Sequence, residues 1–233
     1  AEGATGLMLV HDSRYVGYLS NHAVLRLASE REVSDAREQN PLTQLPGNQS
    51  INRHIAEILT EAGPATLVFI DFDNFKAFND TYGFAAGDRS LQMFADLLRC
   101  LSRELSAFVG HIGGDDFFLS LQVADSVCEQ EVRNLCDRFA RDAESLYSAA
   151  DRAAGGIRAG DRFGIERFFP LLSVSAGILH LPASRSHLTM EMVEQQLAAL
   201  KKLSKIASSR MAVGRLPESA PELMRRHLTA ALG

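Results

Sequence analysis

The sequence predicts an α+β fold in which a central antiparallel sheet carries flanking helices. Residues 65–70 form a continuous apolar run that ends abruptly at Asp71, a pattern typical of a central buried strand. Residues 108–112 and 117–121 are joined through Gly113-Gly114, a dipeptide that favours a β-hairpin. Helix-spaced apolar residues separate and follow these strands. The order strand, helix, hairpin, helix, strand, helix predicts a split βαβ arrangement with its helices on one face of the sheet.

Composition narrows the class of protein. The chain has 233 residues, of which 46% are apolar and 23% are charged, the balance of an ordinary globular protein. Its formal net charge of −5 gives no general attraction to nucleic acid, and no apolar run is long enough to span a bilayer. Three cysteines without metal-like spacing are typical of reduced thiols in the cytosol. We therefore expect no nucleic-acid partner, no membrane contact and a cytoplasmic location.

The first 39 residues have a pattern of their own. Two short apolar runs, 7–10 and 15–19, predict a β-hairpin that is too small to hold a core alone. Residues 21–39 are polar and favour a helix with a thin apolar stripe, which we interpret as a linker helix able to pair with its own copy in a dimer. The chain starts at Ala1 without a methionine, so we expect it to be a fragment of something longer.

The remaining elements follow from apolar spacing and helix-breaking residues. Asn40-Pro41 ends the linker helix, because the residue before a proline is pushed out of helical geometry. Further helices are expected near 51–59, 91–101, 126–146 and 193–206, with a loop over 149–164 and a strand over 171–179. Residues 213–233, which contain two prolines, are interpreted as a C-terminal helical tail.

The first acidic pair, Asp71 and Asp73, comes where the apolar strand ends. Alternation along an extended chain places both carboxylates on one side. A carboxylate at the end of a buried strand is costly to desolvate unless a cation binds it, and Mg²⁺ prefers hard oxygen ligands of this kind. Taken alone, the residues also suit a strand-ending aspartate that caps the following turn.

The second acidic pair, Asp115 and Asp116, follows the Gly-Gly turn. If this hairpin lies beside the strand ending at Asp71, carboxylates from two strands converge, as in palm-type nucleotidyl-transfer sites that hold metal ions. Gly113 and Gly114 leave the turn without side chains, so a nucleotide can lie against the backbone. The alternative is an ordinary hairpin with acidic residues.

Several other polar residues suit either recognition or an ordinary surface role. Lys76 can place a charge on a phosphate, while Asn79 and Asp88 can read the edge of a purine. Each also suits a solvated position, and Asp88 suits a helix cap. The helix dipole alone stabilises lysines near a helix C-terminus, and only proximity to the acidic pairs would make phosphate ligands of Lys201, Lys202 and Lys205.

Taken in order, these segments resemble the motifs of GGDEF domains. The matching residues are 40–48 (NPLTQLPGN), 69–80 (FIDFDNFKAFND), 82–88 (YGFAAGD), 113–117 (GGDDF) and 172–178 (LSVSAGI), with 201–210 as a looser match. The resemblance covers residues 40–212, and five motifs in order are far more specific than one. It is strongest to GGDEF domains that follow CBS modules, in proteins that often carry an EAL phosphodiesterase domain further upstream. Residues 1–20 would then be the remnant of a CBS-like domain.

The resemblance implies a nucleotidyl cyclase fold that is similar to polymerase palms, with a ferredoxin-like βαββαβ core. It also implies a diguanylate cyclase, which condenses two GTP into cyclic di-GMP and pyrophosphate in bacterial signalling. Each copy in a homodimer would present one GTP, so that each 3′-hydroxyl attacks the α-phosphate of the other.

The same resemblance implies roles for particular residues. The metal ion, Mg²⁺ or Mn²⁺, would be held by Asp71, the Phe72 carbonyl and Asp115. The catalytic carboxylates would be Asp115 and Asp116. Guanine would be read by Asn79 and Asp88, and the nucleotide would lie against Gly113 and Gly114. Phosphates would be contacted by Lys76 and Lys205.

The sequence departs from the family pattern in the motif itself, which has aspartate where glutamate is usual. The shorter side chain keeps the charge but withdraws the oxygens by one methylene, so metal geometry must adjust. Asn40 and His111 replace a family Asp and Arg that form an ion pair, so a neutral contact between them is expected. Glu104 and Ala107 replace the product-inhibition motif R-x-x-D, and Arg210 falls one residue late for a phosphate-binding arginine.

These departures leave two other functions open. A catalytically inactive GTP-binding module that regulates an upstream EAL phosphodiesterase would bind GTP without turnover. A purely structural dimerisation module would bind no nucleotide, which would leave the paired carboxylates without a role.

Overall fold

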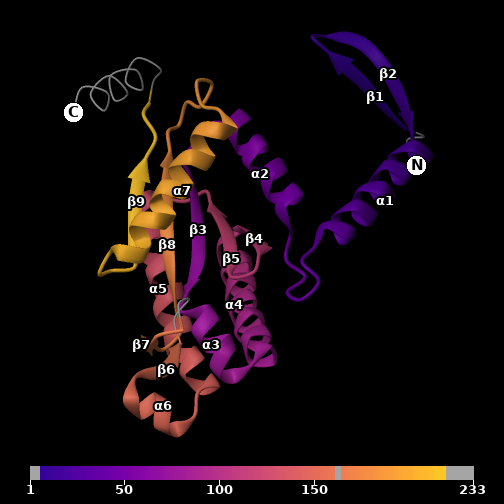
Figure 1. Cartoon of the computed structure of the whole chain (residues 1–233). Helices are drawn as coiled ribbons and strands as arrows, with labels where there is room; N and C mark the ends of the chain where they lie inside the picture. Colours follow the sequence, from indigo (N-terminus) through magenta and orange to yellow (C-terminus); the bar gives the residue numbers. More distant parts are fainter. Residues whose placement is uncertain (1–5, 161–163, 219–233) are drawn as a thin grey trace. The chain divides into compact units, whose positions relative to one another are not determined.

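A computed structural model describes residues 6–160 and 164–218 (Figure 1). It divides the chain into two compact units, Ala1–Gln39 and Asn40–Gly233. Within the described residues, no helix combines the length and the apolar character that crossing a bilayer requires.

The first unit is a hairpin followed by a helix. Strands β1 (Gly6–His11) and β2 (Arg14–Ser20) pair antiparallel, and α1 (Asn21–Glu38) follows with the Ser20 hydroxyl at its N-cap. Asp12 and Ser13 have φ angles of 47° and 60°, as a two-residue hairpin turn with matching twist requires. The predicted hairpin is therefore confirmed. Its apolar side chains are exposed, and its origin as a CBS-like remnant stays a prediction.

The second unit is built on a five-stranded sheet in the order β4-β5-β3-β8-β9. Its strands are β3 (Ala65–Asp73), β4 (Phe108–Gly113), β5 (Asp116–Leu121), β8 (Ser173–Leu181) and β9 (Met211–Arg215). Strand β3 is antiparallel to both of its neighbours, β5 and β8. The first four strands follow the split βαβ order, so the predicted α+β fold is confirmed.

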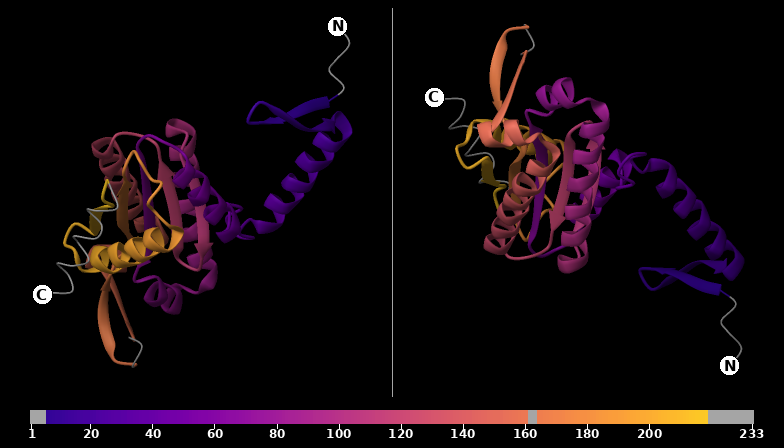
Figure 2. Two further views of the ribbon diagram at one scale, coloured as in Figure 1. Left: turned by 90° about the horizontal axis from the view of Figure 1, so that it is seen from above. Right: turned by 90° about the horizontal axis from the view of Figure 1, so that it is seen from below.

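Helices cover both faces of this sheet, which corrects the expectation that they pack on one face (Figure 2). One face carries α4 (Phe84–Leu105) and α5 (Asp125–Ala143), and the other carries α2 (Asn48–Thr60) and α7 (Met190–Ile206). Every residue of β8 is buried. A strand that is covered on both faces has a continuous apolar sequence, and residues 65–70 of β3 show this pattern.

Three stretches have structure that the sequence did not predict. The expected loop over 149–164 contains α6 (Ala149–Ala154) and β6 (Gly156–Gly160), and β6 pairs with β7 (Glu166–Pro170) in a hairpin that projects from the unit (Figure 2). A short helix, α3 (Phe75–Tyr82), precedes α4, and a 3₁₀ turn (Glu144–Leu146) follows α5. The stretch over 149–164 is rich in Gly, Arg and Asp, which indicate a loop, but pairing with β7 makes a strand of β6.

The predicted helical tail over 213–233 is wrong for its first residues. Residues 211–215 form β9, which runs parallel to β8, and Leu216 is buried. After α7 returns along the sheet, the next segment meets the open edge of β8, whose backbone groups need partners. Residues 219–233 lie outside the described residues.

Candidate functional site

The ends of β3 and β5 bring the two acidic pairs together. In the antiparallel register, Asp71 lies opposite Asp116 of β5 and opposite Ser175 of β8. Asp73 accepts hydrogen bonds from the Ser173 and Ser175 hydroxyls at 2.8–2.9 Å. Carboxylates from neighbouring strands therefore meet at one end of the sheet, as the sequence predicts.

Phe72 anchors the end of β3 in the core. Its side chain is 2% exposed, and its ring centroid lies 4.8–5.8 Å from those of Phe75, Phe94, Phe117 and Phe139. Because side chains alternate along a strand, burying Phe72 turns its two acidic neighbours to the other face. The Phe72 carbonyl oxygen accepts a hydrogen bond of 2.8 Å from Lys205.

Two lysines of α7, one helical turn apart, bring positive charge to these carboxylates. Lys201 Nζ lies 2.8 Å from Asp71 Oδ2 and 2.5 Å from Asp116 Oδ1. Lys205 Nζ contacts Asp71 Oδ1 and lies 2.8 Å from Asp73 Oδ1. Their spacing puts both side chains on one face of the helix. Proximity to the acidic pairs, which the sequence could not decide, is thus established for both lysines.

Gly177 of β8 lets α7 come this close. A Cβ at this position would lie 2.9 Å from the backbone carbonyl carbon of Leu200 and from the backbone nitrogen of Lys201. Real Cβ atoms essentially never approach backbone atoms at that distance. The glycine of the S-x-G segment therefore has a packing role, which is to seat the lysine-bearing turn of α7 on the sheet.

Burial and the lysines set the protonation of the carboxylates. Burial favours the neutral form of Asp71, but hydrogen bonds from Lys201 and Lys205 outweigh it and lower its pKa. Burial raises the pKa of Asp116 to about 6, because Lys201 offsets it only in part and the neighbouring Asp71 adds to it. Burial opposes the charge of Lys201, but Asp116 and Asp71 raise its pKa. Asp71, which contacts both lysines, therefore holds its charge more firmly than Asp116.

The Gly-Gly turn places Asp115 beside this cluster. Burial raises the pKa of the half-buried Asp115, and the charge of Asp71 raises it further. The Asp115 carbonyl accepts a hydrogen bond of 3.2 Å from the Phe72 backbone nitrogen. Gly113 and Gly114 have φ angles of 146° and 59°, which favour glycine, and a Cβ on either would meet nothing within 4 Å. The turn is thus open to a ligand approaching its backbone.

His111 ties this turn to the segment that opens the unit. Its Nδ1 lies 2.9 Å from Thr43 Oγ1, and its Nε2 lies 3.1 Å from the Gly114 carbonyl oxygen. Burial lowers the pKa of His111, so the neutral ring accepts from the Thr43 hydroxyl and donates to Gly114. Asn40 instead accepts from the backbone nitrogens of Leu42 and Thr43 at 3.0 Å. The expected neutral contact between Asn40 and His111 is thus replaced by one between Thr43 and His111.

The residues expected to bind guanine lie on α3 and α4. Asn79 Oδ1 is buried and has no hydrogen-bond partner among the described residues. A Cβ on Gly87 would lie 1.9 Å from this oxygen, so the Asn79 amide rests against α4 one residue before Asp88. Asp88 is exposed within α4 rather than at its cap. Lys76 is exposed and pairs with Asp80 at 2.6 Å, so the structure holds it on its own helix.

The predicted metal ligands lie at the end of β3 and in the Gly-Gly turn beside it. Among the residues that the structure describes, no group of three or more His, Cys, Asp or Glu is arranged to hold a metal ion. The predicted metal ligands comprise two carboxylates, Asp71 and Asp115, and one backbone carbonyl, that of Phe72. Lys205 Nζ contacts both Asp71 and that carbonyl, so one ammonium group stands where a metal ion is expected. This oxygen-rich set fits a hard divalent ion.

The family resemblance gives no role to Lys201, Asp73 or the two serines of β8. The four-residue spacing between Lys201 and Lys205, and the alternate serines of the S-x-S stretch, are signals that could have found them. Arg210 Nη1 lies 3.9 Å from Asp73 Oδ2, so this arginine reaches the edge of the cluster despite its shifted position.

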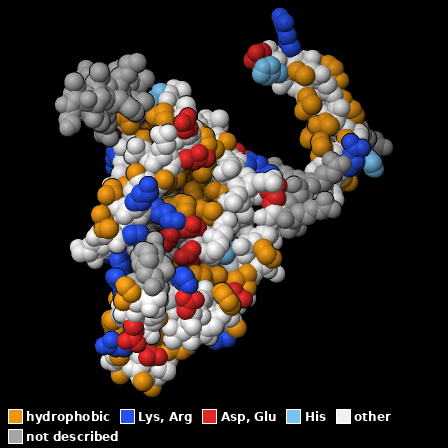
Figure 3. Space-filling model, viewed as in Figure 1, with side chains coloured by type: hydrophobic (Ala, Val, Ile, Leu, Met, Phe, Trp, Pro, Cys, Tyr) orange, Lys and Arg blue, Asp and Glu red, His pale blue; other side chains and the backbone are white. Residues whose placement is uncertain are grey.

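An apolar pocket of about 270 Å³ opens beside the acidic cluster, between α2, α7 and the sheet. Figure 3 shows it as an orange hollow next to red acidic and blue basic side chains. Lys201 forms part of its wall, with Nζ 4.6 Å from the centroid of the Phe69 ring. The stem of this lysine therefore crosses apolar surface before its ammonium group reaches Asp71 and Asp116.

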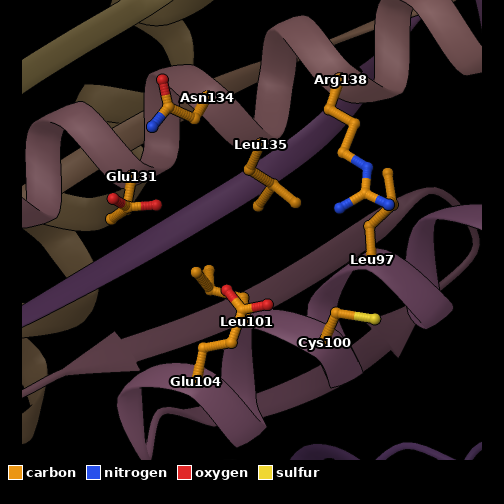
Figure 4. Close-up of a pocket in the computed structure, with 8 residues that line it drawn as sticks. All are labelled: Leu97, Cys100, Leu101, Glu104, Glu131, Asn134, Leu135 and Arg138. Atoms are coloured by element: carbon orange, nitrogen blue, oxygen red, sulfur yellow. The ribbon is translucent and has the colours of Figure 1, made fainter.

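A smaller pocket of about 80 Å³ lies between α4 and α5 (Figure 4). Glu104, which stands at the arginine position of the product-inhibition motif, lines it together with Glu131 and Arg138. Two carboxylates and so small a volume make a poor site for the phosphates of a cyclic dinucleotide. This geometry supports the expectation that the inhibitory site is missing.

Comparison with known proteins places these features in a family. Residues 37–160 match the family model described as diguanylate cyclase, GGDEF domain. The diguanylate cyclase DgcS of Shewanella oneidensis is 37% identical over 90 residues, which cover 36% of this chain and 30% of that protein. The probable diguanylate cyclase DgcE of Escherichia coli is 36% identical over 95 residues, which cover 39% of this chain and 8% of that protein. The chain thus spans less than a third of either relative.

A solved structure shows the same fold. The coiled coil and GGDEF domain of DgcB from Caulobacter crescentus, determined in complex with c-di-GMP, matches with a TM-score of 0.58 at 20% identity. The match covers 84% of this chain and 94% of that chain.

Proposed function

Because this chain belongs to the GGDEF family, we propose that its second unit is a diguanylate cyclase that condenses two GTP into cyclic di-GMP. The observation that carries the proposal is the register of Asp71 against Asp116, which gathers carboxylates beside the open Gly-Gly turn. Gathered carboxylates next to accessible backbone suit a metal ion and a triphosphate.

The metal ion, Mg²⁺ or Mn²⁺, would be held by Asp71, the Phe72 carbonyl and Asp115. When bound, it would polarise the α-phosphate and lower the pKa of the attacking hydroxyl. The contacts of Lys205 with Asp71 and the Phe72 carbonyl support this assignment, because they mark a position where a cation is stable. Asp116 would lie near the reacting groups and orient the hydroxyl. Phosphate oxygens would then draw Lys205 to themselves.

Asn79 and Asp88 would read the guanine edge. The buried oxygen of Asn79 has no hydrogen-bond partner among the described residues. A hydrogen bond from guanine to this oxygen would therefore make binding more favourable. A purine NH group is a suitable donor to it. The backbone of Gly113 and Gly114 would lie against the phosphates, and Lys76 would reach them after releasing Asp80.

The reaction needs two copies of the chain. Each would hold one GTP, and each 3′-oxygen would bond to the α-phosphorus of the other nucleotide while that phosphorus loses pyrophosphate. Two phosphodiester bonds form and two pyrophosphates leave, and each hydroxyl proton passes to a base or water. CBS and EAL domains in a longer chain would be the regulatory partners. We place the reaction in the cytoplasm, where GTP is made.

The deciding experiment is to incubate the chain with GTP and Mg²⁺ or Mn²⁺ and to measure cyclic di-GMP by mass spectrometry. Asp115→Asn should lower the rate at least about hundredfold, more than the loss of residues that only support metal ligands. Asp137→Asn, an exposed change on α5, is the matched control and should retain activity. The specific activity should also rise with protein concentration as dimers form.

Failure would take one of two forms. GTP binding by calorimetry without product, even after fusion to a dimeric partner, would leave the chain as a GTP-binding regulatory module. No GTP binding at all would reject both functions.

A further inference from the structure

Asp71 is bridged by two ammonium groups in this structure. Lys205 contacts its Oδ1 and Lys201 lies 2.8 Å from its Oδ2. Lys201 also lies 2.5 Å from Asp116 Oδ1, which Lys205 does not contact in the interactions described. The two lysines therefore occupy two adjacent cation positions, and Lys201 holds the one between Asp71 and Asp116.

The position of Lys201 is fixed by packing. Its side chain is 28% exposed, whereas the next residue, Lys202, is exposed to solvent. The Lys201 Nζ lies 4.6 Å from the centroid of the Phe69 ring, and the Lys201 backbone rests on Gly177 of β8. A lysine held in this way loses little further conformational freedom when it pairs with the carboxylates. Its ion pairs are therefore stronger than those of an ordinary surface lysine.

The pairing has a consequence for metal binding. A divalent ion that binds Asp71 must compete with the Lys201 ammonium group, which already contacts Asp71 and Asp116. The triphosphate of a nucleotide offers this ammonium group alternative oxygen acceptors of higher negative charge. When metal ion and triphosphate bind together, the phosphate oxygens can accept the Lys201 ammonium group while the metal ion takes its place at the carboxylate. A metal ion that binds without nucleotide leaves the displaced ammonium group without such an acceptor.

We propose that Lys201 is an internal counter-ion that competes with the divalent metal for the Asp71 carboxylate until a nucleoside triphosphate binds. The nucleotide-free domain then binds metal weakly, and metal and nucleotide bind together with positive coupling. The inference rests on the proposed function for the identity of the nucleotide, but the competition between lysine and metal is a property of the free chain.

The test is Mn²⁺ binding to the nucleotide-free chain, followed by the electron paramagnetic resonance signal of unbound Mn²⁺. Lys201→Met keeps the length of the stem but removes the charge, and it should tighten Mn²⁺ binding about tenfold, the scale of a lost charged hydrogen bond. Lys202→Met is the matched control and should leave the affinity unchanged. Adding Asp71→Asn to Lys201→Met should remove the gain, which places the bound ion at this carboxylate.

A second arm adds a GTP analogue with a methylene group between the α- and β-phosphorus atoms, which cannot release pyrophosphate. The wild-type chain should then bind Mn²⁺ much more tightly, and its difference from Lys201→Met should shrink. Circular dichroism checks folding, and Lys201→Gln, which keeps a hydrogen-bond donor, replaces the Met variant if that variant unfolds.

An unchanged or weaker Mn²⁺ affinity in the folded, nucleotide-free variants would overturn the proposal, because Lys201 would then support the carboxylates rather than compete for them. Because the Mn²⁺ titration needs no turnover, its outcome is independent of whether the chain is a cyclase. A chain that makes no cyclic di-GMP can still show the competition, and an active cyclase can still lack it.

Discussion

At the scale of single residues, Asp116 shows how neighbours decide the state of a carboxylate. It has the same side chain as Asp71 and lies opposite it in the sheet, yet burial raises its pKa to about 6 while the pKa of Asp71 is lowered. The difference follows from the lysines, because two contact Asp71 and only one contacts Asp116. No inspection of the GGDDF motif alone could assign these two states.

Asp116 should therefore make metal–nucleotide binding sensitive to acid. A carboxyl group with a pKa of about 6 is ionised above that pH and protonated below it, so the negative charge beside the metal ligand Asp71 is lost as the pH falls. Between about pH 7.5 and about pH 5.5 the ionised fraction drops roughly fourfold, and Mn²⁺ affinity in the presence of the methylene analogue should drop by up to this factor.

Titrations at several pH values with the wild-type chain and with Asp116→Asn check this prediction. The phosphates of the analogue also titrate, but they do so equally with both proteins. The difference between the two pH profiles of Mn²⁺ affinity therefore reports the titration of Asp116. Identical profiles would show that this carboxyl group does not titrate in the range.

Gly87 controls the position of the Asn79 amide at the same scale. A methyl group on Gly87 would collide with Asn79 Oδ1 and push the amide aside. If Asn79 reads guanine, Gly87→Ala should weaken GTP binding about fivefold, the value of one hydrogen bond, and leave ATP binding unchanged. Calorimetry with both nucleotides gives the answer, and an equal loss for ATP would indicate general damage to α3 and α4 instead.

At the scale of elements, the site depends on how α7 and β3 are seated. Phe72 fixes the end of β3 among aromatic rings, and Gly177 lets α7 lie directly on β8. His111 links the Gly-Gly turn to Thr43, which belongs to the segment before α2. The acidic cluster is thus held by contacts from several elements, which lie in different parts of the sequence.

Gly177→Ala should separate α7 from the sheet. The added Cβ would lie 2.9 Å from backbone atoms, which cannot rotate away as a flexible side chain can. Overpacking of this kind costs roughly 1–3 kcal/mol in the free energy of unfolding. Chemical denaturation should show the loss, and Mn²⁺ binding should change with it because Lys201 moves.

Gly160→Ala is the matched control for this variant, since the nearest atom to its Cβ would be 3.8 Å away. It should leave stability within about 0.5 kcal/mol of the wild type. Equal stability in both variants would mean that α7 adjusts without cost.

At the scale of the whole molecule, the acidic cluster and the pocket at Glu104 lie on different faces of the sheet. The open turn and acidic cluster lie on the side of α7, whereas Glu104 lies between α4 and α5 on the other face of the sheet. The pocket at Glu104 is small and carries a second carboxylate, Glu131. Nothing in its described lining other than Arg138 attracts an anion.

The chain should therefore lack feedback inhibition through this surface. Initial rates of cyclic di-GMP synthesis should stay within about twofold when the product is added at concentrations far above that of the protein. Calorimetry of the Asp115→Asn variant with cyclic di-GMP provides an independent measure of binding. Tight binding, or strong inhibition that disappears on changing Arg138, would show that this pocket accepts the product after all.

The sequence by itself determined the order of the elements and the identity of the acidic pairs, because apolar runs, spacing and the Gly-Gly turn are local signals. It also predicted that Asp71 and Asp73 share one side, which follows from the alternation of a strand. The coverage of both sheet faces and the parallel strand β9 depend on contacts between separate segments, so local patterns did not reveal them. The hairpin β6–β7 joins neighbouring segments, but a stretch rich in Gly, Arg and Asp indicated a loop there.

Only the tertiary structure decided which residues surround the acidic pairs. It placed Lys201 between Asp71 and Asp116, joined His111 to Thr43 instead of Asn40, and kept Lys76 on its own helix. The sequence alone does not show whether a lysine side chain is solvated or pairs with two carboxylates. The difference arises from the close approach of α7 to β8, which depends on how the helix packs back on the sheet.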